Sequence, residues 1–124
     1  MGRRFLFASV LLVFATATVA ETKLRKLNAG EVRQTLIGKV ISDGFHWRYH
    51  LKENGSIDGS ELGRSRKGRW HLEGSRLCID ITAGAAPDQC WDVMREGQNL
   101  VFSINGSVIY DITVEEPRHV SKRQ

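Results

Sequence analysis

Phe45-His46-Trp47-Arg48-Tyr49-His50-Leu51-Lys52-Glu53-Asn54-Gly55-Ser56-Ile57 is the stretch that decides the fold. Apolar and basic residues alternate in it as far as Lys52, which is the period of a strand with one buried and one solvated face. Glu53-Asn54-Gly55 is typical of a three-residue hairpin loop, because glycine accepts the left-handed conformation of a bulge. The stretch therefore predicts two antiparallel strands, with Leu51 opposite Ile57.

The same pattern recurs through the rest of the chain, where glycine-containing turns separate alternating apolar segments. The fold class is therefore expected to be mainly β, an antiparallel meander that forms a small barrel or half-barrel. In its last hairpins we expect Val93 to face Leu100 and Phe102 to face Val108. The expected strands are residues 39–42, 45–52, 56–62, 67–73, 76–82, 89–95, 99–104 and 107–114.

One short helix is expected before the first strand. Asn28 is a suitable N-cap, and Glu31 lies three residues later, where its side chain can complete a capping box. The helix should run from Ala29 to Ile37. Val32 and Leu36, four residues apart, give it one apolar stripe for docking on the sheet.

Residues 1–20 have the three parts of a secretory signal peptide. A basic start at Arg3 and Arg4 precedes an apolar run from Phe5 to Phe14, interrupted by Ser9, and small residues follow up to Ala20. The apolar run is shorter than the ~20 residues of a comfortable membrane span. We expect cleavage after Ala20, with Ala17 as the alternative, no stable membrane span, and a mature protein that is periplasmic or secreted.

The mature chain has the length of a single domain, which we place at residues 21–114. Residues 115–124 lack periodic apolar positions and are expected to form a flexible tail. The formal net charge of the whole chain is +4, and removal of the leader takes away two of these charges. This weak positive balance gives no support for a nucleic-acid partner.

Cys78 and Cys90 are expected to form a disulfide, because an even pair of cysteines in an exported chain usually does. The hairpin register places them opposite each other, with Arg76 across from Asp92 as an ion pair. The bridge would lie on the face away from the main apolar layer. Metal binding is the weaker interpretation, because no set of cysteines and histidines with zinc spacing surrounds the pair.

Few residues are candidates for chemistry. His46 and His50 share a strand face, but about 13 Å of strand separates them, which is too far for one metal ion. Asp80, Asp88 and Asp92 could form an acid/base pair or a weak calcium site, although ordinary surface charge is favoured. No nucleophile signature is present. His71 and His119 have no better support, so we expect no catalytic residue, no metal and no cofactor.

Two groups of residues are candidates for binding. Aromatic residues are expected mainly in the core, bounding any ligand cavity, and basic residues could contact an acidic partner or anionic lipid. For the basic residues, a solvated loop and tail are the favoured alternative. The aromatic layer is Phe45, Trp47, Tyr49, Trp70 and Trp91, of which Trp47, Tyr49, Trp70 and Trp91 are the candidates for binding a ligand or partner. The basic cluster is Arg64, Arg66, Lys67 and Arg69, with a second one at Arg118, Lys122 and Arg123.

Several motifs resemble those of small exported, largely uncharacterised β-rich proteins of alphaproteobacteria. They are Trp47-x-Tyr49, Asn54-Gly55-Ser56, the segment 68–78 and Cys90-Trp91, and the likeness covers most of residues 27–110. The resemblance implies a fold and supplies no catalytic residues. A looser likeness, on Gly68-x-Trp70, is to calycin-type barrels, among them periplasmic inhibitors of secreted metalloproteases.

Together these observations predict a non-enzymatic exported binding or interaction protein of the bacterial envelope. Its partner would be an unknown protein or a small apolar ligand. The alternative is a periplasmic protease inhibitor, or a secreted effector that acts on a host or competitor protein.

Overall fold

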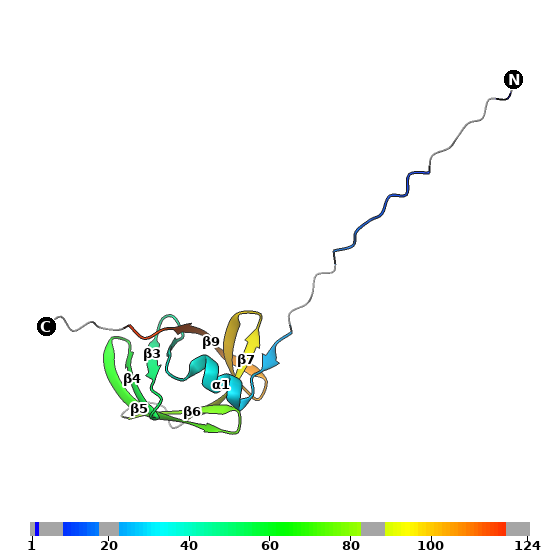
Figure 1. The fold of residues 1–124 in the computed structure, drawn as a ribbon. Coiled ribbons are helices and arrows are strands. Elements are labelled where there is room, and N and C mark those ends of the chain that lie inside the picture. The colour runs from blue at the N-terminus through cyan, green and yellow to red at the C-terminus, as the bar shows by residue number, and fades with distance from the viewer. Residues whose placement is uncertain (1, 3–8, 18–22, 83–88, 119–124) are drawn as a thin grey trace.

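The structure is a computed structural model that describes residues 2, 9–17, 23–82 and 89–118. Within these residues the fold consists of antiparallel strands and one short helix (Figure 1). The elements are β1 (Arg25–Lys26), α1 (Ala29–Leu36), β2 (Val40–Ser42), β3 (Trp47–Leu51), β4 (Ser56–Glu61), β5 (Arg64–Glu73), β6 (Arg76–Ile81), β7 (Gln89–Glu96), β8 (Asn99–Ile104) and β9 (Ser107–Glu115).

The strands close into an eight-stranded antiparallel barrel. From β2 to β9 each strand pairs with the next one along the chain, and β9 also pairs with β2. The short β1 pairs with residues 94 and 95 of β7, beyond the stretch of β7 that pairs with β6. The predicted meander is therefore confirmed, and it forms a complete barrel.

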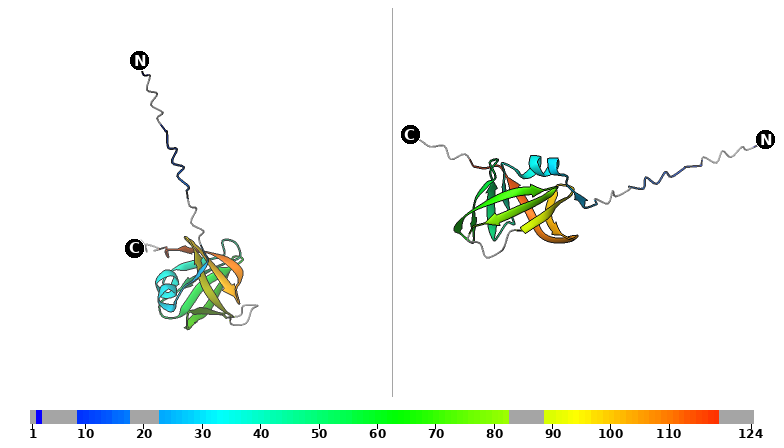
Figure 2. Two further views of the ribbon diagram at one scale, coloured as in Figure 1. Left: turned by 90° about the vertical axis from the view of Figure 1, so that its right-hand side faces the viewer. Right: turned by 90° about the horizontal axis from the view of Figure 1, so that it is seen from below.

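Helix α1 begins as the sequence predicts. The side chain of Asn28 accepts a hydrogen bond from the backbone N–H of Glu31 at 2.8 Å, and the Glu31 carboxylate accepts from the backbone N–H of Asn28 at 3.2 Å. Val32 and Leu36 are fully buried in the core. The right-hand view of Figure 2 places α1 across one end of the barrel, with the β4–β5 and β8–β9 turns at the other.

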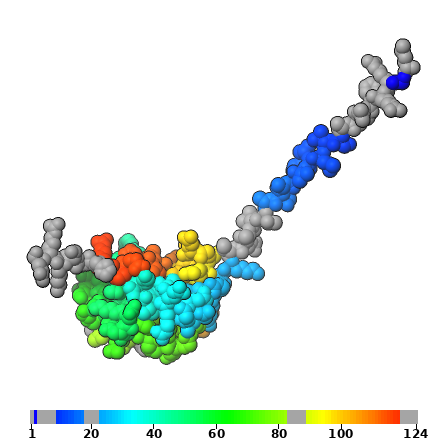
Figure 3. Space-filling view, in the orientation of Figure 1, coloured from blue at the N-terminus to red at the C-terminus, as the bar shows by residue number. Residues whose placement is uncertain are grey.

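The barrel interior is filled by inward-facing side chains that pack on one another and on α1. Aromatic rings form its centre: Trp91 stacks on Phe102 at a centroid distance of 5.3 Å, and Trp47 meets the edge of Tyr110 at 5.7 Å. Burial of each large side chain contributes about 1.5–3 kcal/mol. The space-filling view shows α1 seated against the strands, with its outer side exposed (Figure 3).

Gly68 lies where neighbouring strands of the barrel wall approach closely. Strand β5 pairs with β4 through Arg69 and with β6 from Gly68 onward, so both neighbours meet β5 at this position. A Cβ atom on Gly68 would lie 2.8 Å from Cδ1 of Ile81 and would collide with the carbonyl oxygen of Asp80. Close approach of the backbone therefore requires glycine here.

Two of the expected registers are wrong, and turn geometry explains both. Val93 lies opposite Phe102, because the turn after β7 contains only residues 97–98 and places Glu96 opposite Asn99. Phe102 lies opposite Tyr110, because a bulge between residues 102 and 103 shifts the last hairpin. The expected pairing of Leu51 with Ile57 is confirmed.

Several strand boundaries differ from the prediction, most of them by one residue, and three of these differences affect the description below. The strand expected at 45–52 begins only at Trp47, and the strand expected at 67–73 begins at Arg64. Strand β9 continues through Glu115, whose carboxylate accepts a hydrogen bond from Arg48 at 2.7 Å, so the start of the expected tail belongs to the barrel. No pattern in the sequence predicts β1.

Residues 9–17 belong to the expected leader. The structure gives them no helix or strand and leaves their side chains exposed. Among the residues that the structure describes, no helix has both the length and the apolar character needed to cross a membrane.

Candidate functional site

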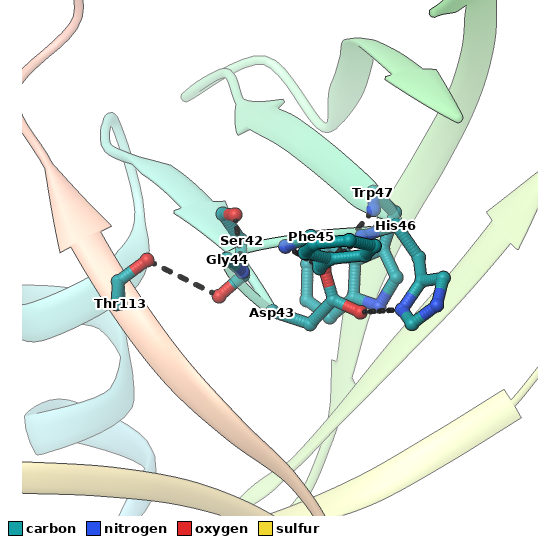
Figure 4. Close-up of polar contacts among 7 residues, drawn as sticks. All are labelled: Ser42, Asp43, Gly44, Phe45, His46, Trp47 and Thr113. Carbon is teal, nitrogen blue, oxygen red and sulfur yellow. Dashed lines mark hydrogen bonds and ion pairs between the residues drawn. The ribbon is translucent and has the colours of Figure 1, made fainter. Parts of the chain in front are cut away.

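The loop that joins β2 to β3 is organised around Asp43. One carboxylate oxygen of Asp43 accepts hydrogen bonds from the backbone N–H groups of Phe45, His46 and Trp47, at 3.0, 2.7 and 3.1 Å (Figure 4). Its other oxygen lies 2.9 Å from Nδ1 of His46. These bonds draw residues 45 and 46 out of the extended conformation, which is why β3 starts at Trp47.

The Asp43 carboxylate is held in its charged form. Its side chain is 8% exposed. Burial alone would raise the pKa of Asp43, but the backbone N–H donors of Phe45, Trp47 and His46 and the His46 ring lower it to about 2. The loop is therefore braced by a charge-assisted network at neutral pH.

Neighbouring segments fix the same loop from outside. The Ser42 hydroxyl accepts a hydrogen bond from the backbone N–H of Gly44 at 2.7 Å, and the Thr113 hydroxyl donates to the Ser42 carbonyl at 3.3 Å (Figure 4). On the other side, the backbone N–H of Leu62 donates to the His46 carbonyl at 2.8 Å. The β2–β3 loop and the β4–β5 turn therefore form one connected unit.

This unit exposes two large apolar side chains. Phe45 is 86% exposed and Leu62 is 76% exposed. A hollow of about 220 Å³ lies between them, bordered also by Arg48 and Ser60. We call Phe45, Leu62 and this hollow the rim patch. The expectation that Phe45 belongs to the aromatic core is wrong, because the Asp43 network turns its backbone outward.

Leu62 has an unfavourable backbone conformation. Its φ is 48°, in the left-handed region, and Gly63 follows with φ 79°. A tight turn between β4 and β5 requires positive φ at both positions, which suits Asn or Gly far better than leucine. Because Leu62 is strained and mostly exposed, burial in the core does not account for a leucine at this position.

A polar cluster lies close behind the rim patch. The Tyr49 hydroxyl donates to the Glu61 carboxylate at 2.7 Å, and Nε of Arg66 donates to the other Glu61 oxygen at 3.3 Å. Burial, and then the hydrogen bond to Glu61, raise the pKa of Tyr49. Arg66 therefore forms an ion pair with a residue of its own chain, Glu61.

The basic residues expected to form a cluster all lie on β5, within Arg64–Glu73. Alternation of side chains divides them between the two faces of the strand. Arg66 pairs with Glu61, and Lys67 pairs with Asp58, which also binds Lys52. Because successive residues face opposite ways, Arg64, Arg66, Lys67 and Arg69 do not present one continuous cationic surface.

Three of the four aromatic binding candidates are buried. Tyr49, Trp70 and Trp91 retain less than a tenth of their surface. Trp70 also has a structural hydrogen bond, from its indole N–H to the Lys52 carbonyl at 2.7 Å. Trp47 is half-buried, stacks on Tyr49 at 4.8 Å and borders the hollow. Of the four, Trp47 reaches the rim patch.

The titratable candidates are dispersed. His46 is part of the Asp43 network, His50 lies on β3, and Asp80 lies on β6 opposite Arg69. Asp92 does lie opposite Arg76, but its ion pair is with Lys26, at 3.4 Å. Arg118 follows β9 and is exposed. Asp88, His119, Lys122 and Arg123 lie outside the described residues.

Cys78 and Cys90 form a disulfide between directly opposed residues of β6 and β7. Leu77 and Ile79, the neighbours of Cys78, point into the core. Cys78 therefore lies on the outer side of the barrel wall, although it is fully buried there. Both the bridge and its face agree with the sequence prediction.

Comparison with protein-family models, curated proteins and solved structures found no match to this chain. The functional argument therefore depends on the residues of the site.

Proposed function

We propose that this protein is a non-enzymatic, exported binding protein, and that it recognises another protein through the rim patch. The observation that carries the proposal is the exposure of Phe45 and Leu62 on two loops that a backbone hydrogen bond holds together. Exposed aromatic and aliphatic anchors on a rigid base are typical of protein-binding surfaces. We place its work in the bacterial envelope or outside the cell.

The packed interior favours a protein partner over a small apolar molecule. Trp47 of β3 stacks on Phe102 of β8 at 6.4 Å, and Trp91 of β7 stacks on Phe102 at 5.3 Å, so aromatic rings occupy interior space that a ligand-carrying barrel would need as free volume. The hollow that the described residues Phe45 and Leu62 border lies at the outer rim, next to Arg48 and Ser60. A partner that covers this rim would shield Phe45 and Leu62 from water.

The bracing of the loop supports the same proposal. A loop that is already ordered before binding loses little conformational entropy when it binds, which raises affinity. Asp43 orders the loop through bonds to three successive backbone N–H groups. Ordering of an exposed loop to this degree has a clear use in recognition, because Phe45 itself adds nothing to the core.

Export is supported by the composition of residues 1–20 and by the disulfide between Cys78 and Cys90. Disulfides form and persist in oxidising compartments. The partner is therefore expected among periplasmic, surface or extracellular proteins.

The second candidate function is a protease inhibitor, or an effector that acts on a host or competitor protein. One observation favours the inhibitor. The braced loop presents Phe45 as a protruding side chain, a shape that fits an apolar specificity pocket. An inhibitor of this kind would form a stoichiometric complex with a protease and would lose it on Phe45→Ser. A binding protein of the general kind would leave protease activity unchanged.

Site-specific photo-cross-linking tests the proposal. A photoreactive phenylalanine analogue at position 45 should give a discrete protein adduct in the cells that make the protein. The matched control places the same analogue at Asn99, the exposed first residue of β8, next to the turn at the α1 end of the barrel. An adduct that forms equally at both positions, or that survives Leu62→Asn, contradicts the assignment of the rim patch.

A further inference from the structure

We propose that reduction of the Cys78–Cys90 disulfide creates a site for one divalent metal ion of the zinc class. Its ligands would be His71, Glu73, Cys78 and Cys90. The site lies on the outer face of β5, β6 and β7, away from the rim patch, and the proposal does not depend on the proposed function.

Strand register brings the four residues together. His71 pairs with Cys78, and Cys78 pairs with Cys90, so these three lie side by side across three strands. Glu73 follows His71 by two residues on β5 and therefore shares its face. This convergence follows from the barrel topology, and the spacing of the residues in the sequence does not reveal it.

The distances from Glu73 to the other candidate ligands are close to those of a metal site, and the two sulfur atoms, which are bonded to each other in the disulfide, would separate on reduction. Nε2 of His71 lies 3.4 Å from Oε1 of Glu73, and Sγ of Cys90 lies 3.8 Å from Oε2 of Glu73. The ligand atoms of His71, Glu73 and Cys78 all lie within 4.8 Å of one another. A tetrahedral ion with bonds of about 2.0–2.3 Å places its ligand atoms roughly 3.3–3.8 Å apart.

The ligand set matches zinc chemistry. Two thiolates, an imidazole and a carboxylate are all accepted by Zn²⁺, and four protein ligands would fill its coordination. The side chains of His71 and Glu73 are 52% and 60% exposed, so they can turn toward an ion without repacking the core. Both cysteines are held by strand pairing, which fixes the sulfur side of the site.

The disulfide controls the site because thiolates, and not disulfide sulfurs, are strong metal ligands. A dithiol reductant would break the S–S bond by thiol–disulfide exchange, supplying two electrons and two protons and leaving as a disulfide. Cys78 and Cys90 would become thiols, and binding of the ion would release their two protons. Reoxidation to the disulfide would require loss of the ion.

Titration with Cd²⁺ provides the test, because cadmium–thiolate bonds absorb in the ultraviolet. Protein reduced with a phosphine should bind one Cd²⁺ with thiolate absorption, and the oxidised protein should bind it at least about 100-fold more weakly. His71→Ala and Glu73→Gln should each weaken Cd²⁺ binding about tenfold or more, which is the usual effect of losing one residue that supports a metal site. His50→Ala, on β3, is the matched control and should leave binding unchanged.

Circular dichroism in the same titration shows whether the reduced chain stays folded. If reduction unfolds the barrel, the proposal requires that Cd²⁺ restores the folded spectrum. Absence of binding, equal binding to the oxidised and reduced forms, or binding that is insensitive to both His71→Ala and Glu73→Gln would each overturn it. The last result would mean that the two thiolates bind the ion by themselves.

Discussion

The backbone N–H of Leu62 donates a hydrogen bond to the carbonyl of His46 over 2.8 Å. This single bond joins the β4–β5 turn to the loop that Asp43 braces. As a result, the exposed side chains of Phe45 and Leu62 are held by one hydrogen-bonded unit, although they lie in different loops of the chain. Backbone bonds therefore set the positions of residues 45 and 62, and these positions should not change when either side chain is replaced.

Leu62→Asn should stabilise the protein while it weakens partner binding. Asparagine tolerates the left-handed conformation that Leu62 adopts with φ 48°. Relief of this strain should raise the free energy of unfolding by about 1 kcal/mol. Denaturant unfolding measures the gain, and cross-linking at Phe45 measures the loss of binding.

Leu62→Ala is the matched control for this change, because it removes the apolar side chain and keeps the backbone strain. It should reduce binding without the gain in stability. A leucine that matters for packing would give the opposite pattern, in which both variants are less stable than the natural protein.

Asp43→Asn should change how stability depends on pH. The folded-state pKa of Asp43 lies at about 2, below its ordinary value of 3.8. A lowered carboxyl pKa contributes stability above the ordinary value, and this contribution is lost as pH falls through the folded value. The variant should lose about 2 kcal/mol at pH 7 and should show less further loss than the natural protein between about pH 4 and 2.

Other carboxylates titrate in the same range, so the informative quantity is the difference between the two proteins. The pKa of Asp58 is also lowered to about 2, first by the hydrogen bonds from Lys52 and Lys67. Asp58→Asn serves as a comparison away from the loop. Parallel stability curves for the natural protein and Asp43→Asn from neutral to acidic pH would contradict the assigned role of Asp43.

Gly68→Ala should destabilise the barrel by about 1–3 kcal/mol, the usual cost of overpacking. The added methyl would meet Cδ1 of Ile81 at 2.8 Å and the Asp80 carbonyl more closely still. Gly30→Ala is the control, since its nearest contact would be 3.5 Å from the Asn28 side chain and the helix accepts alanine. Equal stability of Gly68→Ala and the natural protein would show that the neighbouring strands can move apart at this position.

Replacement of both cysteines by alanine should lower stability by about 2–4 kcal/mol without change of fold. The disulfide closes a loop with a sequence separation of 12. Denaturant unfolding of the variant and of the oxidised natural protein measures the difference. Two titratable thiols in the protein purified from its own compartment would contradict the assignment of a disulfide there.

The sequence predicts the parts of this fold that are governed by alternation and local capping. Leu51 opposite Ile57, the capping box of Asn28 and the opposition of Cys78 and Cys90 follow from spacing alone. Closure of the barrel by β2 and β9 joins segments about 70 residues apart, and no local pattern encodes it. The predicted register of Phe102 is also wrong, because the alternation of apolar residues does not reveal the bulge that follows it.

The candidate site was harder to foresee for a related reason. Phe45 continues the alternation of Trp47 and Tyr49, so the pattern alone assigns it to the core. Asp43-Gly44 before it is the one available signal, because an aspartate whose side chain accepts from the following N–H groups starts a turn. Leu62 has no signal apart from Gly63, and the convergence of His71, Glu73 and the cysteines requires three strands to be placed.

Trp70 is a buried residue of the barrel core and is not part of the rim patch, so its variants test whether the two are independent. Its ring is 8% exposed, its indole donates to the Lys52 carbonyl at 2.7 Å, and its backbone N–H donates to the Gly55 carbonyl at 2.9 Å. Trp70→Ala removes a large buried surface and should cost about 3–5 kcal/mol.

Trp70→Phe keeps most of the ring and removes the indole donor, so it should cost less than Trp70→Ala, and the Lys52 carbonyl would be left without this partner. At temperatures where both variants remain folded, cross-linking at Phe45 should equal that of the natural protein, because the Asp43 network does not involve Trp70. If Trp70→Phe abolished the adduct while its melting temperature stayed near that of the natural protein, the buried tryptophan would belong to the binding site, and the division between scaffold and rim would be wrong.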